Sequence, residues 1–417
     1  MLRITSLRFV FYSPEKSVVT QVRELSVSPS TNLSDLVLAL PEGNYKLVVI
    51  ANPTTKLVAR TAVGSPLSQL TGYEHYYTDE LATKGSQLTV SLLNEQGPVT
   101  VTSAAFSSTI PQVRIQLESV LARVLVYGEP RLAGGAKRGS APAGYVLSPQ
   151  ARYTAPLRPL GLLRTGGSEV AGDGSHPEDR YPTSRMCQEW KDSAPRSLTE
   201  LLSHFALDRM TSHEGGEDIY LARLLPDEQA LAAAVSNIHA YARETTLPPT
   251  AYLVGALPSL VIRFPYIPAG LTLRENEGWV SFRGKYYTES QMKEWIRSDD
   301  FDDPTLAEAV KAARINEDSF TAPFEKGDLR FYYRGYNYYV VPIRHFDDTK
   351  APTKTSIGRY GVVRGAEYRI HLTQILRPGT PVPPDLTADL TPVAEEKNVH
   401  AIVSVRPIVV HSSEIHI

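Results

Sequence analysis

The chain has 417 residues, of which 42% are hydrophobic and 21% charged, and its formal net charge is −2. This is the composition of a globular protein with enough residues for two or three domains, and the balanced charge argues against a nucleic-acid partner. The single cysteine, Cys187, excludes an internal disulfide, and no run is long and apolar enough to predict a membrane-spanning helix.

The first part of the chain is predicted to form strands. Apolar and polar residues alternate in "ITSLRFVFYS" (4–13) and "KSVVTQVRELSV" (16–27), which is typical of half-buried strands. The segment "LVLALPEGNYKLVVIANP" (36–53) contains two strands around a Pro-Glu-Gly-Asn turn. The spacing in 113–127 fits either a strand or an amphipathic helix, so both interpretations stay open there.

An irregular stretch follows over residues 130–197, where Pro and Gly recur among Arg and Ser. Helices are then predicted at 197–210 and 226–243. Two more helices carry clear start signals. One has a capping box from Thr288 to Gln291, and the other has Asp303 at the N-cap with Pro304 next to it.

Strands surround these helices in the second half, and no repeat of fixed period is present. The pattern therefore predicts a mostly β chain with a few short helices. We expect two β-rich domains, an N-terminal one over 1–225 that includes the excursion at 130–197, and a C-terminal one over 226–417.

The chain ends on the apolar alternation "HAIVSVRPIVVHSSEIHI" (400–417), which predicts a terminal strand. Apolar residues that share one side are Val403, Val405, Val409, Ile415 and Ile417. Pro407 removes a backbone donor, which favours an edge position or a kink. We expect the first half of this tail, 401–410, to pair within its own domain and the second half to reach outward.

No pattern of catalytic or metal-binding residues is found. "GGAKRGS" lacks the Gly-Lys-Ser/Thr order of a phosphate-binding loop, and "HEGGE" (213–217) lacks the second His of a zinc helix. The acidic segment "SDDFDDPT" offers oxygen ligands without the spacing of a calcium loop, and helix capping by Asp303 explains part of it. His345 is interpreted as a packed histidine. The sequence predicts no enzyme, no cofactor and no metal.

Four segments together resemble the fimbrillins of Bacteroidia, also called type V pilins. They are "LPEGNYKLVVIANP", "YYVVPIRHF", "GRYGVVRGAEYRI" and "VSVRPIVVHSSEIHI". The order and approximate spacing of the segments agree with the family as well. Gly365 stands where the family usually has Asn, and Ile408 stands where it usually has Trp, which favours an accessory or tip-associated subunit over a shaft subunit.

The resemblance implies two transthyretin-like β-sandwich domains and a structural, adhesive subunit of a cell-surface fimbria. It implies a lipoprotein precursor exported through the outer membrane and trimmed by an arginine-specific protease, which opens a groove near the N-terminus. The candidate residues for this processing site and groove edge are Arg3, Ile4, Leu7 and Phe9.

The implied partners are other fimbrial subunits and a host or bacterial surface receptor. A strand of one subunit would complete the sheet of the next, as in strand exchange generally, and the terminal strand is the candidate donor. The alternative is a surface carbohydrate- or protein-binding module that does not polymerise and binds its ligand through Tyr-rich strands, with Tyr336 and Tyr338 as candidates.

Overall fold

The computed structural model describes residues 3–33, 35–84, 88–103, 112–158, 190, 193–206, 222–231, 238–345, 360–384, 398–408 and 412–416. Strands dominate these ranges, and the predicted fold class, mostly β with a few short helices, is confirmed. Within them, every helix is too short or too polar to cross a membrane. Cys187 and the HEGGE segment lie outside the described residues.

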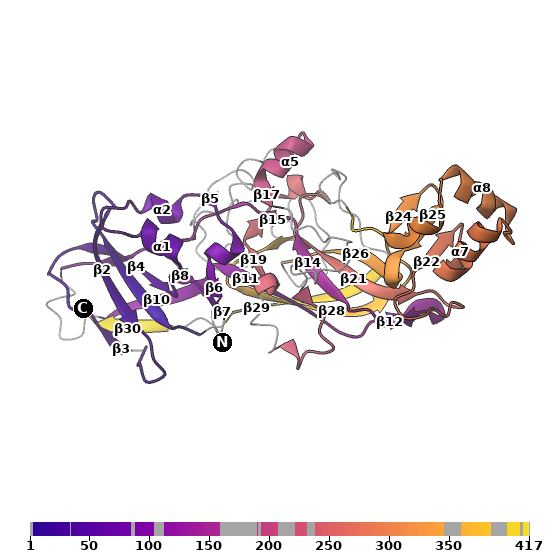
Figure 1. Ribbon diagram of the computed structural model, residues 1–417. Helices are drawn as coiled ribbons and strands as arrows, with labels where there is room; N and C mark the ends of the chain where they lie inside the picture. The colour runs from indigo at the N-terminus through magenta and orange to yellow at the C-terminus, as the bar shows by residue number, and fades with distance from the viewer. Residues whose placement is uncertain are drawn as a thin grey trace.

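The N-terminal part of the chain forms an eight-stranded sheet, seen at the left of Figure 1. Its order is β2-β1-β4-β8-β10-β30-β3, with β9 also paired to β4. The strands are β1 (Ser6–Tyr12), β2 (Val19–Ser26), β3 (Asp35–Val37), β4 (Tyr45–Ala51), β8 (Leu92–Asn94), β9 (Val99–Val101), β10 (Gln112–Ser119) and β30 (Ser412–His416). We call these strands and the connections between residues 3 and 120 the first region.

Both faces of the first region's central strands are covered, which explains why β1 and β4 are almost entirely buried. Phe9, Val10, Val48 and Ile50 have no exposed surface, and all four belong to one hydrophobic cluster. The short elements around the sheet are α1 (Thr55–Arg60), α2 (Ser68–Thr71), η1 (Thr78–Glu80), β5 (Glu74–His75), β6 (Ala82–Lys84) and β7 (Leu88–Val90).

Two further sheets face each other in the middle of the molecule (Figure 1). One contains β11 (Leu121–Tyr127), β12 (Arg131–Leu132), β19 (Tyr241–Arg243), β28 (Ala366–Ile375) and β29 (Val399–Pro407). The other contains β13 (Lys137–Arg138), β14 (Gly144–Ser148), β18 (Ala222–Arg223), β21 (Ser259–Ile267) and β26 (Tyr336–Pro342). We call this pair of sheets the sandwich.

The sandwich is held by one cluster to which both sheets contribute every second residue of their strands. Val124 on β11 and Ile370 on β28 come from one sheet, and Ile262 on β21 and Tyr339 on β26 from the other. Burying apolar surface between two pleated faces is the ordinary source of stability in such a fold. Short elements beside it are α5 (Leu198–His204), β15 (Gln150–Ala151), β16 (Tyr153–Thr154), β17 (Phe205–Ala206), β20 (Thr245–Thr246), β27 (Gly361–Val362), η2 (Ala133–Gly135), η4 (Ile238–Ala240) and η5 (Pro249–Ala251).

The chain changes sheets at Val120. β10 ends at Ser119 in the first region, and β11 begins at Leu121 in the sandwich, where it pairs in parallel with β28. The segment 113–127 is therefore two strands rather than a helix. From this change of partners we propose that the first domain ends near residue 120, and not near 225 as the composition suggested.

A third unit extends from the sandwich and forms the orange end of the ribbon in Figure 1. We call residues 279–332 the outer module. Its sheet has the order β23-β22-β25-β24, from β22 (Trp279–Phe282), β23 (Lys285–Thr288), β24 (Phe324–Lys326) and β25 (Leu329–Tyr332). Its helices are α7 (Glu289–Ser298) and α8 (Pro304–Ala312), followed by η6 (Glu317–Thr321). The turn η7 (Tyr333–Gly335) comes directly after the module and leads back to β26.

The two helices begin where the sequence predicted. The Thr288 hydroxyl accepts a hydrogen bond from Gln291 N (3.1 Å), and Gln291 Oε1 accepts one from Thr288 N (2.9 Å). Asp303 Oδ1 caps α8 by accepting from Thr305 N at 3.0 Å and Leu306 N at 3.4 Å. The predicted helix at 226–243 is wrong at both ends, because residues 226–230 form bends and a turn, and residues 241–243 pair with β11 as strand β19. Burial of Tyr241 and Ala242 there outweighs the local helix preference of an Ala-rich run.

Trp279 fixes the outer module to the sandwich. Its ring is fully buried and stacks on Tyr332 with centroids 3.7 Å apart, and its Nε1 donates to Tyr266 O at 2.9 Å. Tyr266 belongs to β21 of the sandwich. One side chain thus joins the first and last strands of the module to the strand from which the module departs.

We expect Trp279→Ala to destabilise the outer module by about 3–5 kcal/mol, because the substitution leaves a large cavity and removes the shorter of the two side-chain hydrogen bonds to Tyr266 O, while the bond from Asn337 Nδ2 remains. Hydrogen exchange of residues 279–332 would measure the loss. The matched control is Trp295→Ala on α7, because the Trp295 ring is partly exposed. This substitution should increase the hydrogen exchange of the module far less than Trp279→Ala does. Equal exchange in the two variants would contradict the role of Trp279.

Candidate functional site

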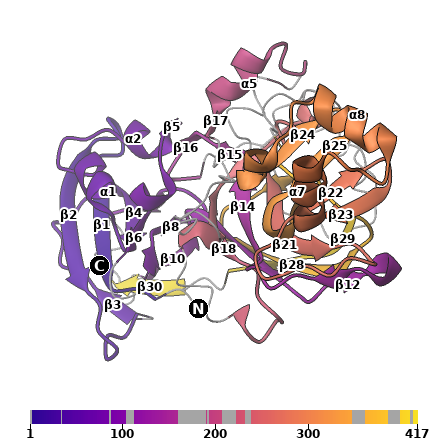
Figure 2. The ribbon, with the colours of Figure 1, turned by 45° about the vertical axis from the view of Figure 1, so that its right-hand side comes forward.

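The C-terminal strand β30 lies in the sheet of the first region, between β10 and β3 (Figure 2). It pairs antiparallel with β10, from Gln112 opposite His416 to Gln116 opposite Ser412. On its other side it pairs in parallel with β3, with Leu36 opposite Ile415. We call the position between β10 and β3 the strand slot. A strand in this slot has a neighbour along each edge.

The structure separates the tail residues that the sequence grouped together. Val403 and Val405 lie on β29, which pairs antiparallel with β28, and their half-buried side chains pack on the sandwich cluster. The backbone of Ile415 lies in the strand slot. Val409 and Ile417 lie outside the described residues. The two halves of the tail therefore complete two different sheets, and whether the second half also joins a neighbouring chain stays a prediction.

The N-terminal candidates lie along and before β1. Arg3 is exposed, whereas Ile4, Leu7 and Phe9 are buried in the first region's cluster. β1 pairs with β2 on one edge and β4 on the other, so an open edge at Leu7 and Phe9 does not fit this pairing. Asn52 holds the start of the chain, because its Nδ2 donates to Arg3 O (2.8 Å) and its Oδ1 accepts from Thr5 N (2.8 Å).

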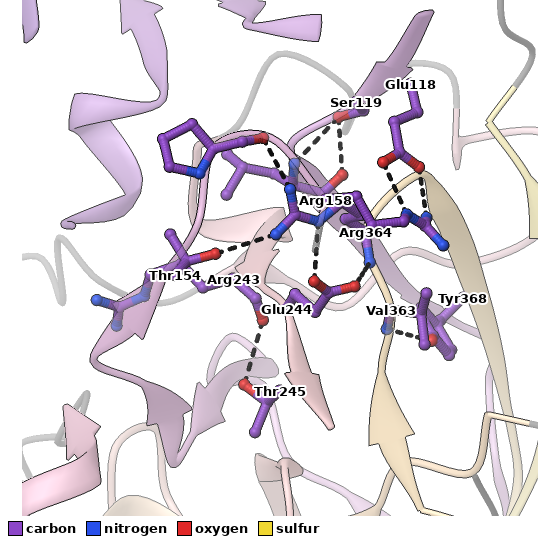
Figure 3. Close-up of polar contacts among 12 residues, drawn as sticks. Glu118, Ser119, Thr154, Arg158, Arg243, Glu244, Thr245, Val363, Arg364 and Tyr368 are labelled. Atoms are coloured by element: carbon purple, nitrogen blue, oxygen red, sulfur yellow. Dashed lines mark hydrogen bonds and ion pairs between the residues drawn. The ribbon is translucent and has the colours of Figure 1, made fainter. Parts of the chain in front are cut away.

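A buried set of charged residues lies where the first region meets the sandwich (Figure 3). Glu118, near the end of β10, accepts two hydrogen bonds from the guanidinium of Arg158, one of them from Nε at 2.8 Å. Only 5% of the Glu118 side chain is exposed. A two-pronged bond of this kind fixes orientation as well as charge. This bond holds the segment that follows β16 against the end of β10 in the first region's sheet.

Arg364 is buried a short distance away, with 1% of its side chain exposed. Its Nε donates to Glu244 Oε2 (2.9 Å), and its Nη1 donates to Pro156 O (2.8 Å). Its third bond runs from Nη2 to Thr154 Oγ1 (3.3 Å), as Figure 3 shows. Arg364 thus joins three segments distant in sequence, and its charge is balanced by Glu244. We call Glu118, Arg158, Glu244 and Arg364 the junction charges.

The junction places Gly365 against Glu118. Gly365 has φ +69°, and a Cβ built on it would lie 3.5 Å from Glu118 Oε2. Gly and Asn are the residues that most readily adopt this left-handed conformation, which accounts for Gly at a position where fimbrillins usually have Asn. Burial raises the pKa of Glu118 to about 7, although Arg158 opposes the shift. Ile408, the other departure, is buried in the first region's cluster and its N donates to Gly365 O at 2.7 Å.

His345 has a structural partner in the same area. Its Nδ1 lies 2.8 Å from the hydroxyl of Tyr368, which in turn accepts a hydrogen bond from Val363 N at 2.8 Å. The Tyr368 proton is therefore available to His345, so Nδ1 acts as the acceptor of a neutral imidazole. Burial, together with nearby Arg158, lowers the pKa of His345 to about 4. This supports the interpretation of His345 as a packed histidine.

The Tyr-rich run offers little surface for a ligand. Tyr338 is 3% exposed and lies opposite Arg263 of the neighbouring strand β21. Tyr339 and Tyr332 are also buried. Tyr336 is half-buried, with the Arg263 guanidinium 4.4 Å from its ring centroid. The buried rings therefore serve the core and cross-strand packing. In the part of the chain that the structure describes, no three His, Cys, Asp or Glu residues gather as a metal site would require.

Several of these residues come from the last quarter of the chain. Residues 330–414 match the family described as major fimbrial subunit protein type IV, fimbrillin, C-terminal. The resemblance to fimbrillins is therefore confirmed over this segment, which contains "YYVVPIRHF" and "GRYGVVRGAEYRI". Arg364 of the second motif is one of the four junction charges, and Gly365, Tyr368 and His345 of the two motifs lie beside them.

Solved structures with a similar course of chain include a fimbrilin of Porphyromonas gingivalis W83, 14% identical with a TM-score of 0.43, over 97% of this chain and 91% of that one. A putative cell adhesion protein of Parabacteroides distasonis ATCC 8503 is 11% identical, with a TM-score of 0.42 over 97% and 94% of the two chains. Among curated proteins, none matches. The fimbrillin match over residues 330–414 is thus the comparison on which a functional proposal can rest.

We expect Arg364→Ala to lower the free energy of unfolding by about 3–5 kcal/mol, because it leaves Glu244 charged and unpaired in the interior. Urea unfolding followed by circular dichroism would measure the loss. Replacing both partners, Arg364→Met with Glu244→Leu, should recover part of it. Arg283→Ala, which removes an exposed ion pair with Asp328, should change stability little. A loss as small as that of Arg283→Ala would contradict the buried pairing.

We also expect His345 to make stability depend on pH. Its folded pKa, about 4, lies below the usual 6.5, so its contribution is complete above pH 6.5 and is lost as the pH falls towards 4. His345→Asn keeps a polar atom near the Nδ1 position without titrating. The wild type should therefore lose about 2 kcal/mol relative to this variant between pH 7 and pH 4.5. Parallel stability curves for the two proteins would show that His345 does not titrate in this way.

Proposed function

We propose that this protein is a structural, adhesive subunit of a cell-surface fimbria. The observation that carries the proposal is the fimbrillin match at residues 330–414, combined with a terminal strand that lies in a slot bordered by strands on both sides. The role depends on pairing between chains and does not require catalysis.

We propose that assembly proceeds by donor-strand exchange at the strand slot. One side of β10 carries the buried residues Val113, Ile115 and Leu117. The backbone of residues 112–116 pairs with β30, so this edge of β10 needs a strand in the slot. A tail from a neighbouring chain can make the same main-chain bonds as β30 makes within its own chain. Because the donor and the slot are different surfaces, the contact repeats head to tail and yields a fibre.

The other elements of the proposal follow the family. We propose export through the outer membrane as a lipoprotein precursor, trimming by an arginine-specific protease near Arg3, and contacts with shaft and accessory fimbrillins and with a surface receptor. We place the subunit in an accessory or tip-associated position. Immunogold labelling of whole fibres would measure this position, since labelling confined to fibre ends is expected and labelling along the shaft would contradict it.

Cysteine pairs can test the exchange. In a Cys187→Ser background, which removes the one native thiol, Arg114→Cys on β10 and Glu414→Cys on β30 would lie directly opposite each other. When chains carrying only one of these cysteines each are mixed, exchange predicts a disulfide between two different chains. The experiment is repeated with an Arg114→Cys chain that lacks residues 411–417. The cross-link should not decrease, because this chain contributes only the slot.

The control for the cross-link is Lys311→Cys on α8 of the outer module, which is exposed and far from β30 in both views of the ribbon. Mixing it with the Glu414→Cys chain should give no more than random disulfides. If the Arg114 and Glu414 cysteines join only within a doubly substituted chain and never between chains, the strand stays in its own subunit and the exchange is excluded.

A further inference from the structure

A pocket lies at the neck where the outer module leaves the sandwich. Its volume is about 420 Å³, within the range of sites that hold small ligands. Three stretches of chain provide most of its lining: the end of β13 and the loop after it at 138–141, the segment 273–277 that leads into the module, and Arg334 in the turn that leads back. Ile267 at the end of β21 also lines it. We call it the neck pocket. It is separate from the strand slot and from the junction charges.

Three arginines line the neck pocket, one from each of these stretches: Arg138, Arg274 and Arg334. All three are exposed. Within the described part of the chain, Arg274 and Arg334 form no ion pair, and the ion pair of Arg138 with Glu129 is long, at 4.0 Å. The Arg138 guanidinium also lies 5.5 Å from the Phe264 ring centroid, and that of Arg334 lies 5.3 Å from the Tyr333 ring centroid. In the outer module Arg283, Arg297 and Arg330 are each paired with a carboxylate, and Arg314 has no ion pair with any described residue.

The other polar groups of the pocket can form hydrogen bonds with hydroxyl groups of a ligand. Glu277 already accepts bonds from Arg274 N at 2.7 Å and Ser290 N at 3.0 Å, so part of its charge is balanced by the backbone. Glu275, Asn276 and Ser140 add acceptors and donors at the rim. Asn276 and Arg334 both have positive φ, 60° and 53°, so the backbone is held in an uncommon conformation on two sides of the pocket.

We propose that the neck pocket binds an acidic sugar unit of an oligosaccharide, with its carboxylate or sulfate group held by Arg274 and Arg334. Guanidinium groups match the planar arrangement of such oxygens. The carboxylate, amide and hydroxyl side chains at the rim match sugar hydroxyls, and Ile267, Leu273 and Ala141 provide apolar contact.

Titration calorimetry of the full chain with 3′-sialyllactose, 3′-sulfolactose and neutral lactose tests the proposal. The acidic trisaccharide or sulfated disaccharide should bind at least tenfold more tightly than lactose. Arg274→Ala and Arg334→Asn should each weaken that binding about tenfold, since each removes one charge-assisted contact. Asn is chosen at 334 because it tolerates the left-handed backbone.

The control is Arg283→Asn, because Arg283 is also an exposed arginine of the outer module with positive φ (45°) and does not line the pocket. It should leave binding unchanged, and equal thermal midpoints would show that all three variants are folded. The proposal is overturned if neither acidic sugar binds better than lactose, or if Arg283→Asn weakens binding as much as Arg334→Asn does. Neither outcome bears on strand exchange, because no pocket residue lies on β10 or β30.

Discussion

The requirement that buried charges be neutralised governs the centre of this molecule. Arg364 and Glu118 are both removed from water, and each is tolerated only because a partner from another part of the chain meets it. The partners, Glu244 and Arg158, lie just after β19 and β16, so these two segments are held beside Arg364 and Glu118. Buried ion pairs add little net stability, but breaking one is costly, so they specify which segments meet and in which orientation.

Apolar alternation predicts the fold class and strands such as β1, β2 and β4, because each of these strands buries one or both faces against a neighbour. It left 113–127 open between strand and helix, and it missed β19 inside a predicted helix. Start signals were sufficient for α7 and α8, because a cap acts within one turn of its own helix. The change of sheets at Val120 could not be predicted in this way, since the apolar run continues from β10 into β11. The polar pair Glu118 and Ser119 interrupts that run and marks the change of sheets. Its role is clear only in the structure, where Arg158 lies beside Glu118.

The candidate sites also differ in whether local sequence or contacts between distant residues determine them. The tail was recognised from its alternation, but its division between two sheets depends on pairing with β28 and β10, both far away in sequence. The fimbrillin motifs were recognised as strings of residues, and the structure gives them physical roles, since Gly365 supplies a left-handed backbone and Tyr368 binds His345. The neck pocket has no sequence pattern, because Arg138, Arg274 and Arg334 meet only through the fold.

The way the outer module is inserted has a mechanical consequence. β21 and β26 pair directly with each other along seven residue pairs, and the module hangs from the loop that connects them. Tension applied between the first region and the sandwich passes through the chain at Val120 and through the crossing at Ile408. It does not pass through residues 279–332. A strained filament built from such subunits would stretch its junctions while the module at its side kept its shape.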